Sequence, residues 1–263
     1  MEYQQRIIVF IDILGFKEII KSEKPINIAN YIKLLYETEP SKFRFIESKE
    51  RLDEQITYFS DCIVISYLQD KNQNSTVETY DFQHFVSTLI SLQYLMIRDY
   101  NQLIRGAICC GKLIHNNDFC FGPALVKAYE CESKKTKFPR IYMENELVKK
   151  HGAKTNFDDC LIEENGLYFI DPIKHLFNYL NVNKDCNPKC WHEDTWWAFY
   201  NFSRLIEKGL TNTDNRIREK FEYLAKSYNE YLKIFFTENS EREFIMFPNK
   251  LELRKKLDYI IGI

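Results

Sequence analysis

The feature that most restricts the fold is a strand-like apolar run that carries Asp12 in its middle and turns at Gly15 into a second apolar run, at residues 7–20 (IIVFIDILGFKEII). Alternating and β-branched residues over 6–12 predict a buried strand. Asp12 lies in that strand, where an ionised carboxylate is costly unless a cation meets it. Gly15 then permits a tight turn into a second apolar run. The stretch therefore predicts a strand, a turn and a helix, with a metal-binding residue near the junction.

The rest of the first two thirds of the chain alternates between strand and helix patterns. Helical spacing of apolar residues predicts helices over 25–38 and 81–100. Strands are predicted at 6–12, 55–67, 104–114, 139–142 and 166–170, with a weaker one near 160. Because 55–67 also resembles the arm of a hairpin, we expect an α+β fold in which helices cover a mainly antiparallel sheet, rather than a doubly wound parallel sheet.

The sequence pattern changes after Asp171 and Pro172. Strand patterns end there, and 193–209 and 214–236 read as amphipathic helices. This predicts one domain over residues 1–171, which contains Asp12, and a C-terminal helical extension over 172–263. We expect the many aromatic residues of these helices to fill a core or a dimer contact rather than to bind a ligand.

Bulk composition excludes some classes of function. The 36 basic and 38 acidic side chains give a formal charge of −2, so no overall field attracts nucleic acid or an anionic membrane. No apolar run approaches the roughly 20 residues that span a bilayer, and the first ten residues lack the pattern of a secretory signal. A soluble, cytoplasmic protein is expected.

The eight cysteines are scattered, which predicts reduced and mostly buried thiols rather than a disulfide framework. One local group places Cys186, Cys190 and His192 at C-x3-C-x-H spacing without an obvious fourth ligand. Both a zinc site and a loop with two free thiols remain open for this group.

Asp61 repeats the pattern of Asp12, because a single carboxylate interrupts the strand-like segment YFSDCIVIS. Either aspartate alone could cap a turn or accept backbone hydrogen bonds. Two neighbouring strands that present one aspartate each at the same end would form a hard-oxygen site for magnesium or manganese. Two metals held in this way serve phosphoryl chemistry, and backbone N–H groups at 13–16 could then face a phosphate chain.

Three segments resemble class III nucleotidyl cyclases in order and spacing: FIDILGF, YFSDCIVIS and RGAICCGKLIHNNDFCFGPALVKAYECES. The resemblance covers about residues 6–145. It implies a ferredoxin-like catalytic core that works as a head-to-tail homodimer. It also implies that Asp12 and Asp61 are the metal aspartates, that the Ile13 carbonyl is a further ligand, and that each site holds two divalent ions, Mg²⁺ or Mn²⁺.

The sequence departs from purine cyclases of this class where they orient the ribose and read the base. Val126 and Glu130 occupy the usual Asn and Arg positions of the helix that follows Gly122, and Thr57 and Phe119 replace the usual base readers. Either the site is silent or it is rebuilt for another base. Arg105, on a strand that flanks the site, could bind phosphate and act in catalysis, or it could form an ordinary salt bridge.

The pattern of residues in these motifs is similar to that of the bacterial pyrimidine cyclases of the Pycsar anti-phage systems. That resemblance implies conversion of UTP or CTP to cyclic UMP or cyclic CMP, and a product that acts on a separate effector protein. UTP is favoured over CTP on a separate ground, because the Thr57 and Tyr58 hydroxyls and backbone amides could donate to a uracil carbonyl, although the same hydroxyls could accept from the cytosine amine. Thr57 and Tyr58 could read a small base while Phe16 or Phe119 stacks on it, although cross-strand pairing is their ordinary role.

Basic residues follow Gly122 and could bind the triphosphate, although a solvated charged face is the commoner meaning of such a group. The group comprises Lys127, Lys134, Lys135, Lys137 and Arg140. A silent nucleotide-binding or regulatory module is the main alternative function. A relative of GGDEF proteins or of polymerase palms is a third, but the GGDEF motif itself is absent.

Overall fold

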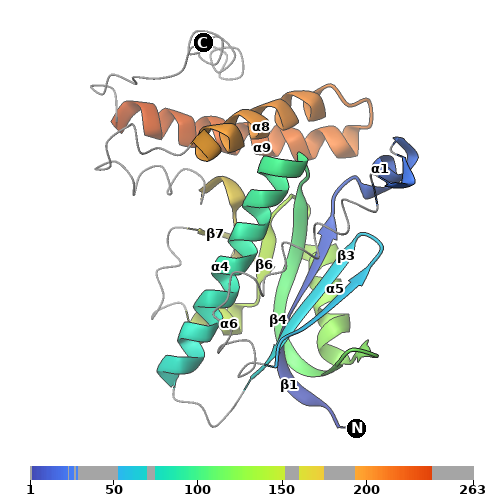
Figure 1. Ribbon diagram of the computed structural model, residues 1–263. Helices are drawn as coiled ribbons and strands as arrows, with labels where there is room; N and C mark the ends of the chain where they lie inside the picture. The colour runs from blue at the N-terminus through green and yellow to red at the C-terminus, as the bar shows by residue number, and fades with distance from the viewer. Residues whose placement is uncertain are drawn as a thin grey trace. The chain divides into compact units, whose positions relative to one another are not determined.

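The computed structural model describes residues 2–22, 24–26, 28, 53–69, 75–151, 160–174 and 193–238 (Figure 1). The chain forms two compact units. Unit 1 consists of Met1–Gln93 and Gln102–Asp171, and unit 2 consists of Tyr94–Asn101 and Pro172–Ile263. The predicted division into a catalytic domain and an extension stays a prediction, since a compact unit need not be a separate function.

Unit 1 is built on one sheet with the strand order β2-β3-β1-β4-β6-β8-β7, and β5 pairs with β4 off this path. Its strands are β1 (Gln4–Ile13), β2 (Gln55–Phe59), β3 (Cys62–Leu68), β4 (Ile104–His115), β5 (Cys120–Phe121), β6 (Ile141–Met143), β7 (Leu161–Glu164) and β8 (Leu167–Ile170). Its helices are α1 (Phe16–Ser22), α5 (Pro123–Lys135), α6 (Asn145–His151) and most of α4 (Ser75–Tyr100).

The pairing of the strands confirms the predicted α+β class with a mainly antiparallel sheet. Only β4 and β6 pair in parallel among the described strands. β1 lies in the middle of the sheet between β3 and β4, and its side chains from Ile7 to Ile11 are buried. Burial on both faces explains why this segment reads as a continuous apolar run rather than an alternating one.

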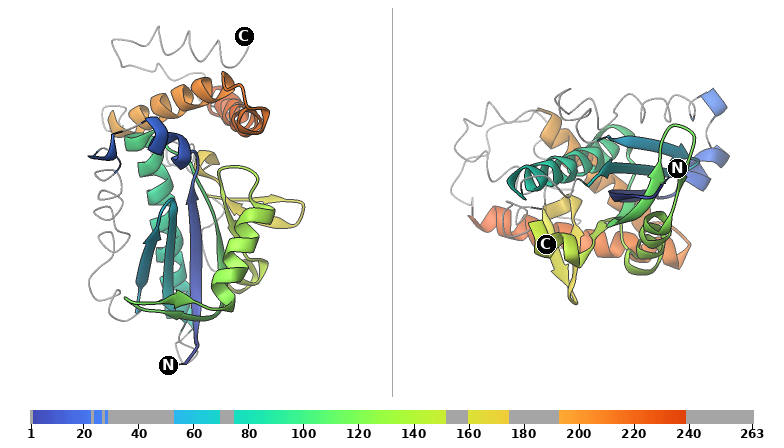
Figure 2. Two further views of the ribbon diagram at one scale, coloured as in Figure 1. Left: turned by 90° about the vertical axis from the view of Figure 1, so that its right-hand side faces the viewer. Right: turned by 90° about the horizontal axis from the view of Figure 1, so that it is seen from below.

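Helices cover both faces of the sheet. On one face, α5 packs Ala124 and Ala128 against Ile8 and Phe10 of β1. On the other face, α4 packs its aromatic side chains against β3, with the rings of Phe85 and Tyr67 5.1 Å apart. Figures 1 and 2 show α4 and α5 on opposite sides of the central strands. Since neighbouring residues of a strand face opposite ways, the odd-numbered residues of β1 face α4 and the even-numbered ones, Asp12 included, face α5.

Several predicted elements differ from the observed ones. The expected strand over 55–67 is a hairpin that turns at Ser60 and Asp61, so Asp61 lies in a turn and not within a strand. The helix predicted at 81–100 begins earlier, at Ser75, while β5 and α6 were not predicted. Most of the helix predicted at 25–38, and the group Cys186, Cys190 and His192, lie outside the described residues.

Unit 2 contains the two helices predicted after Pro172, α8 (Glu193–Leu210) and α9 (Asn215–Glu238). They pack through buried rings, with Phe202 and Tyr228 5.6 Å apart between centroids. Gly209 of α8 lets the two helices approach closely, because a Cβ there would lie 2.0 Å from the Phe221 ring. These aromatic side chains form a core, as predicted. Among the described helices of both units, none is long and apolar enough to cross a membrane.

Candidate metal and nucleotide site

A backbone hydrogen bond holds the β2–β3 hairpin turn against the end of β1. The Ile13 N–H donates to the Asp61 carbonyl at 2.9 Å. Ser60, which precedes Asp61 in the turn, adopts a φ of 55°, a left-handed conformation that a two-residue hairpin needs. The turn and the strand end therefore present Asp12 and Asp61 side by side, although 48 residues separate them in the sequence.

The two carboxylates converge with the thiol of Cys62. One ligand atom from each of Asp12, Asp61 and Cys62 lies within 4.8 Å of the others, and all three residues are half-buried. Burial, together with the Asp61 and Asp12 charges, raises the pKa of the Cys62 thiol to about 12, so this soft ligand stays protonated. The oxygens that remain suit a hard cation. Asp12 and Asp61 would be the residues that hold such a cation, with water or substrate oxygens as its other ligands.

Arg105 joins this site from β4. The register pairs Cys62 with Asp12 and Asp12 with Arg105, so the three side chains share one face of the sheet. The Arg105 Nε donates to Asp12 Oδ2 at 2.9 Å, and the same nitrogen lies 2.6 Å from Glu132 Oε1 of α5. Two carboxylates, Asp12 and Glu132, thus contact one guanidinium, and Asp61 lies beside Asp12, so the acidic side chains of the site outnumber the basic one.

The turn after β1 forms as predicted, but it offers less backbone to a phosphate than the sequence indicated. Gly15 has a φ of 80°, and its carbonyl accepts hydrogen bonds from Glu18 and Ile19, which start α1. The N–H of Ile13 is bonded to Asp61 and that of Leu14 to the Leu103 carbonyl at 2.9 Å. The expectation that N–H groups at 13–16 face a phosphate is therefore wrong for residues 13 and 14, because the sheet uses them.

The structure separates the two aromatic residues that were candidates for base stacking. Phe16 is only 4% exposed and belongs to the core, so its ring offers no open face to a base. Phe119 is 51% exposed and lies in the β4–β5 hairpin. That hairpin contacts the start of β1 through Phe121 and Tyr3, at the opposite end of the strand from Asp12. Within one chain, Phe119 is therefore remote from the two aspartates.

The side chains of Thr57 and Tyr58 lie on opposite faces of the sheet. Thr57 pairs with Val64, on the face that α5 covers, whereas Tyr58 pairs with Ile63, on the α4 face. The prediction that both side chains read one base is wrong, since adjacent residues of a strand point in opposite directions. Thr57 Oγ1 is also bonded to His115 Nε2 at 2.9 Å.

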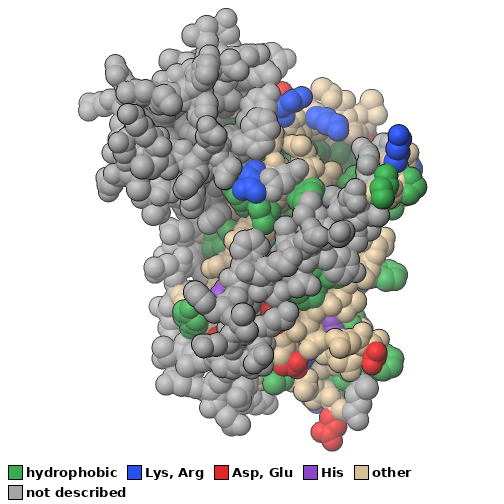
Figure 3. Space-filling view, viewed as in Figure 1, with side chains coloured by type: hydrophobic (Ala, Val, Ile, Leu, Met, Phe, Trp, Pro, Cys, Tyr) green, Lys and Arg blue, Asp and Glu red, His purple; other side chains and the backbone are tan. Residues whose placement is uncertain are grey.

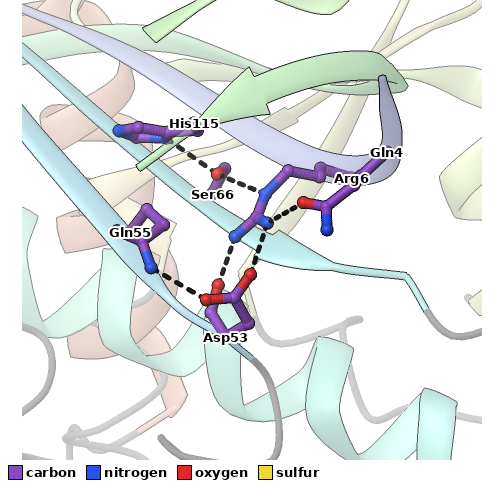
Figure 4. Close-up of polar contacts among 6 residues, drawn as sticks. All are labelled: Gln4, Arg6, Asp53, Gln55, Ser66 and His115. Atoms are coloured by element: carbon purple, nitrogen blue, oxygen red, sulfur yellow. Dashed lines mark hydrogen bonds and ion pairs between the residues drawn. The ribbon is translucent and has the colours of Figure 1, made fainter. Parts of the chain in front are cut away.

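Through His115, Thr57 joins a polar network that the sequence did not reveal. Figure 4 shows the other members of this network, among them His115, Ser66, Arg6 and Asp53. His115 Nδ1 lies 2.8 Å from Ser66 Oγ, which accepts a hydrogen bond from Arg6 Nε at 3.0 Å. Arg6 is fully buried and forms a salt bridge to Asp53 at 2.8 Å. Burial, and then the charge of Arg6, lowers the pKa of His115 to about 4. A neutral His115 that accepts from Ser66 and donates to Thr57 satisfies this network.

The basic residues after Gly122 are mostly engaged. Lys127 forms a salt bridge to Glu144 and Lys134 one to Glu130, while Lys135 bonds the Tyr142 hydroxyl at 2.9 Å. Arg140 is buried against the Phe169 ring. Lys127, Lys134 and Lys135 nevertheless line a surface hollow of about 450 Å³ on α5, together with Val126 and Glu130. The role of Lys127 in substrate binding stays a prediction.

The sequence did not predict two residues that lie near the aspartates, Phe59 and Glu132. Phe59 pairs with Cys62 beside the hairpin turn, shares its face of the sheet, and is 76% exposed. Glu132 is buried beside Arg105. Phe59 could have been noticed as an aromatic residue two positions before Asp61. Nothing in the sequence distinguishes Glu132 from the exposed charges of the same helix, other than its spacing of four from Ala128 and eight from Ala124.

The chain was compared with known proteins. It matches no protein-family model and no curated protein. Among solved structures it is similar to the guanylyl cyclase domain of the RhoGC fusion protein from the aquatic fungus Blastocladiella emersonii, with 14% identity and a TM-score of 0.47 over 65% of this chain and 96% of that chain. It is also similar to the guanylate cyclase domain of RhGC from Catenaria anguillulae in complex with GTP, with 12% identity and a TM-score of 0.45 over 65% and 98%.

A bacterial light-regulated adenylyl cyclase is similar over 76% of this chain and 100% of that chain, with 12% identity and a TM-score of 0.42. Likenesses at this level do not transfer an activity from one protein to another, because function belongs to particular side chains. An activity for this chain therefore has to be inferred from the side chains around Asp12 and Asp61.

Proposed function

We propose that the chain is a nucleotidyl cyclase that converts a pyrimidine nucleoside triphosphate, UTP or CTP, to the 3′,5′-cyclic nucleotide and pyrophosphate. The observation that carries this proposal is the convergence of Asp12 and Asp61 at one end of the sheet, with ligand atoms within 4.8 Å. Paired carboxylates at that spacing, beside an arginine, are the arrangement that phosphoryl transfer needs.

In this proposal Asp12 and Asp61 hold two divalent ions, Mg²⁺ or Mn²⁺, with the Ile13 carbonyl as a further ligand. Such ions, when bound, activate the ribose 3′-hydroxyl and neutralise the phosphates. The 3′-oxygen forms a bond to the α-phosphorus, the bond from that phosphorus to the bridging oxygen breaks, and the hydroxyl proton passes to solvent. Arg105 can direct its terminal N–H groups at phosphate oxygens in a bidentate manner while Nε stays within the protein.

The proposed preference for a pyrimidine rests on positions 57 and 119. Thr57 and Phe119 stand where purine cyclases of the resembled class carry charged or polar base readers. A site that leaves the polar edge of a base unpaired rejects that base by a large factor. The choice of UTP over CTP rests on hydroxyl and backbone N–H groups that could donate hydrogen bonds to a uracil carbonyl. Thr57 could supply such a hydroxyl, whereas Tyr58 lies on the other face of the sheet.

Competition between equimolar ATP, GTP, CTP and UTP with Mn²⁺ present tests this proposal. Mass spectrometry of the products is expected to show mainly cyclic UMP, less cyclic CMP and little purine product. Mainly cyclic AMP or cyclic GMP would refute the pyrimidine preference and leave the cyclase proposal standing. Mainly cyclic CMP would refute only the choice of UTP, and no cyclic product from any of the four would refute the activity.

We also propose that the active form is a homodimer, in which the second copy supplies the residues that one chain places far from Asp12. Several large apolar side chains are exposed in unit 1, including Tyr3, Phe119, Phe121, Val126 and Tyr129. Val126 and Tyr129 lie on α5, which also carries the hollow lined by Lys127. In a head-to-tail pair, this helix and hairpin would meet the Asp12 end of the partner.

The proposed cellular role is the production of a second messenger in anti-phage defence, with a product that acts on a separate effector protein. It rests on the resemblance of the motifs to the pyrimidine cyclases of Pycsar systems. Measuring cyclic UMP and cyclic CMP in cells before and after infection tests it, and an unchanged level of both on infection would contradict it.

One observation favours a second candidate, a catalytically silent nucleotide-binding module. Val126 and Glu130 replace the ribose-orienting and phosphate-stabilising pair of purine cyclases, and Glu130 is paired with Lys134 at 3.0 Å. Turnover with manganese separates the two candidates. A chain that binds UTP or CTP with millimolar affinity or better, and yet forms no product, would support the silent module.

A further inference from the structure

Glu132 is a buried carboxylate on the inner face of α5. The buried residues of that helix are Ala124, Ala128 and Glu132, so a charged side chain follows two small apolar ones along the stripe that contacts the sheet. Its side chain is 3% exposed. A carboxylate is rarely buried to this degree without a cation to compensate it. Glu132 therefore has a specific partner and is not part of the solvated face of the helix.

That partner is Arg105, which Glu132 shares with Asp12. The Arg105 Nε lies 2.6 Å from Glu132 Oε1 and 2.9 Å from Asp12 Oδ2. Since Nε carries one hydrogen, the two carboxylates compete for it. The Arg105 Nη1 reaches the Thr136 carbonyl at 3.4 Å. The guanidinium is thus anchored at the end of α5 as well as at the metal-facing aspartate.

Glu132 is bonded through its side chain and through its backbone. Ser133 Oγ donates to Glu132 Oε2 at 3.0 Å, and the Thr136 N–H donates to the Glu132 carbonyl at 3.1 Å. Because Glu132 belongs to α5 and Asp12 to β1, a rotation of the Asp12 side chain toward a cation does not require Glu132 to move. Arg105 therefore keeps one acidic partner whichever way Asp12 faces.

We propose that Glu132 is a positioning residue that retains Arg105 when Asp12 turns to a divalent cation. Without Glu132, the guanidinium would pair with Asp12 alone and compete with the cation for that carboxylate. With Glu132, the side chains of Asp12, Asp61, Glu132 and Arg105 carry three negative charges and one positive charge, so the first divalent cation to bind meets a net negative site. The inference rests on the proposed function, because it concerns the metal site of that function.

The test is the affinity for Mn²⁺ alone, without nucleotide, measured by the electron paramagnetic resonance signal of free Mn²⁺. The proteins are the wild type, Glu132→Gln, Arg105→Gln and the double variant. Glu132→Gln is expected to weaken Mn²⁺ binding by about 10- to 100-fold, the usual effect of losing a partner of a metal ligand. Arg105→Gln removes the competing cation and is expected to bind Mn²⁺ at least as tightly as the wild type.

The double variant decides whether Glu132 acts through Arg105. In the Arg105→Gln background, Glu132→Gln is expected to change the affinity by less than about threefold, because the guanidinium that it retains is gone. The same loss in both backgrounds would overturn the proposal, since Glu132 would then act on the cation directly. An unchanged affinity of Glu132→Gln in the wild-type background would overturn it too.

Controls separate this inference from the proposed function and from misfolding. Glu163→Gln removes an exposed carboxylate of β7 and is expected to leave Mn²⁺ affinity unchanged. If Asp12→Asn binds Mn²⁺ as tightly as the wild type, the metal site itself is wrong. If Asp12→Asn weakens binding and Glu132→Gln does not, only the role of Glu132 is wrong. Should Glu132→Gln fail to fold, Glu132→Asp keeps the charge and is expected to retain most of the affinity, and a 10-fold loss there would count against the proposal.

Discussion

Asp12 is the residue on which the site depends, because its carboxylate faces both Asp61 and the Arg105 guanidinium. A salt bridge to Arg105 is enough to offset the burial of Asp12 when no metal is bound. The same bond explains how a strand in the middle of the sheet tolerates a carboxylate. Asp12 is therefore compatible with folding before a cation binds, and in the proposed function the cation serves chemistry rather than stability.

Replacing either aspartate by alanine is expected to abolish formation of the cyclic nucleotide while the protein stays folded. Asp12→Ala and Asp61→Ala each remove a ligand of the proposed metals rather than a contact of the core. Product formation is measured with Mn²⁺, and folding by circular dichroism. Glu163→Ala, which removes an exposed carboxylate from β7, serves as the matched control and is expected to retain activity. Wild-type turnover by either folded aspartate variant would contradict the two-metal site.

His115 is expected to make stability depend on pH between about 4 and 6.5. Its pKa is lowered to about 4 in the folded chain, by burial and by the charge of Arg6, and lies near 6.5 when unfolded. Between these values the unfolded chain binds more protons, so the free energy of unfolding rises with pH and levels off above about 6.5. The full contribution is about 3 kcal/mol.

Urea unfolding at pH 5 and at pH 7 measures this effect. His115→Gln can still hydrogen-bond Thr57 and Ser66 but does not titrate, so it is expected to show a smaller difference in stability between the two pH values than the wild type. Equal differences in the two proteins would show that His115 does not titrate across this range.

At the scale of elements, the site depends on the close approach of β4 to β1. Gly106 follows Arg105 and lies opposite Ile11, and a Cβ at position 106 would lie 2.5 Å from the Phe10 carbonyl oxygen. Any larger residue would force the two strands apart next to the salt bridge between Arg105 and Asp12. The close packing of β4 against β1 is thus a physical reason for the glycine in the RGAI segment, independent of the resemblance of that segment to a family.

Gly106→Ala is expected to lower the free energy of unfolding by about 2–3 kcal/mol, because the added methyl group overlaps a backbone oxygen in a packed sheet. It is also expected to reduce activity, since Arg105 moves with its strand. Gly166→Ala provides the comparison, because a Cβ added at position 166 would meet nothing within 4 Å. Only the positive φ of 74° at this position then opposes alanine, and it is expected to lower the free energy of unfolding by about 1 kcal/mol. Chemical denaturation measures both, and an equal cost for the two variants would contradict the close approach of β4 and β1.

At the scale of the whole molecule, one chain does not bring all the predicted substrate-binding residues to one place. Asp12 and Phe119 lie at opposite ends of β1, which spans roughly 30 Å at about 3.3 Å per residue. Lys127 lies on the outer face of α5, in a hollow shared with Val126 and Glu130. Phe119 could serve the same substrate as Asp12 only if a second copy contributes it.

Light scattering is therefore expected to show a homodimer for the wild-type chain. Phe121→Glu places a charge on the exposed aromatic hairpin and is expected to yield a folded monomer without cyclase activity. Ile20→Glu introduces the same charge on α1, where hydrophobic side chains reach the surface as Figure 3 shows, and tests whether any exposed apolar position has this effect. An active wild-type monomer would contradict the dimer.

The sequence alone was enough to predict the α+β class, the main strands, the long helix α4 and the two helices after Pro172. Local periodicity carries that information, because β1 is apolar from Ile7 to Ile11 and α9 repeats its apolar residues at helical spacing. The same apolar runs made Asp12 and Asp61 conspicuous, since a carboxylate there needs a cation. Their pairing at one end of the sheet was predicted, and the Ile13 to Asp61 hydrogen bond brings them together.

Only the tertiary structure decided which side chains accompany the aspartates. Glu132 reaches Arg105 because α5 lies across that face of the sheet. Thr57 of β2 forms a hydrogen bond with His115, which lies at the end of β4. Phe16 enters the core and Phe59 stays exposed, although both are phenylalanines close to a metal-facing aspartate. Contacts between residues tens of positions apart depend on how the elements pack, and local periodicity in a single sequence does not contain that information.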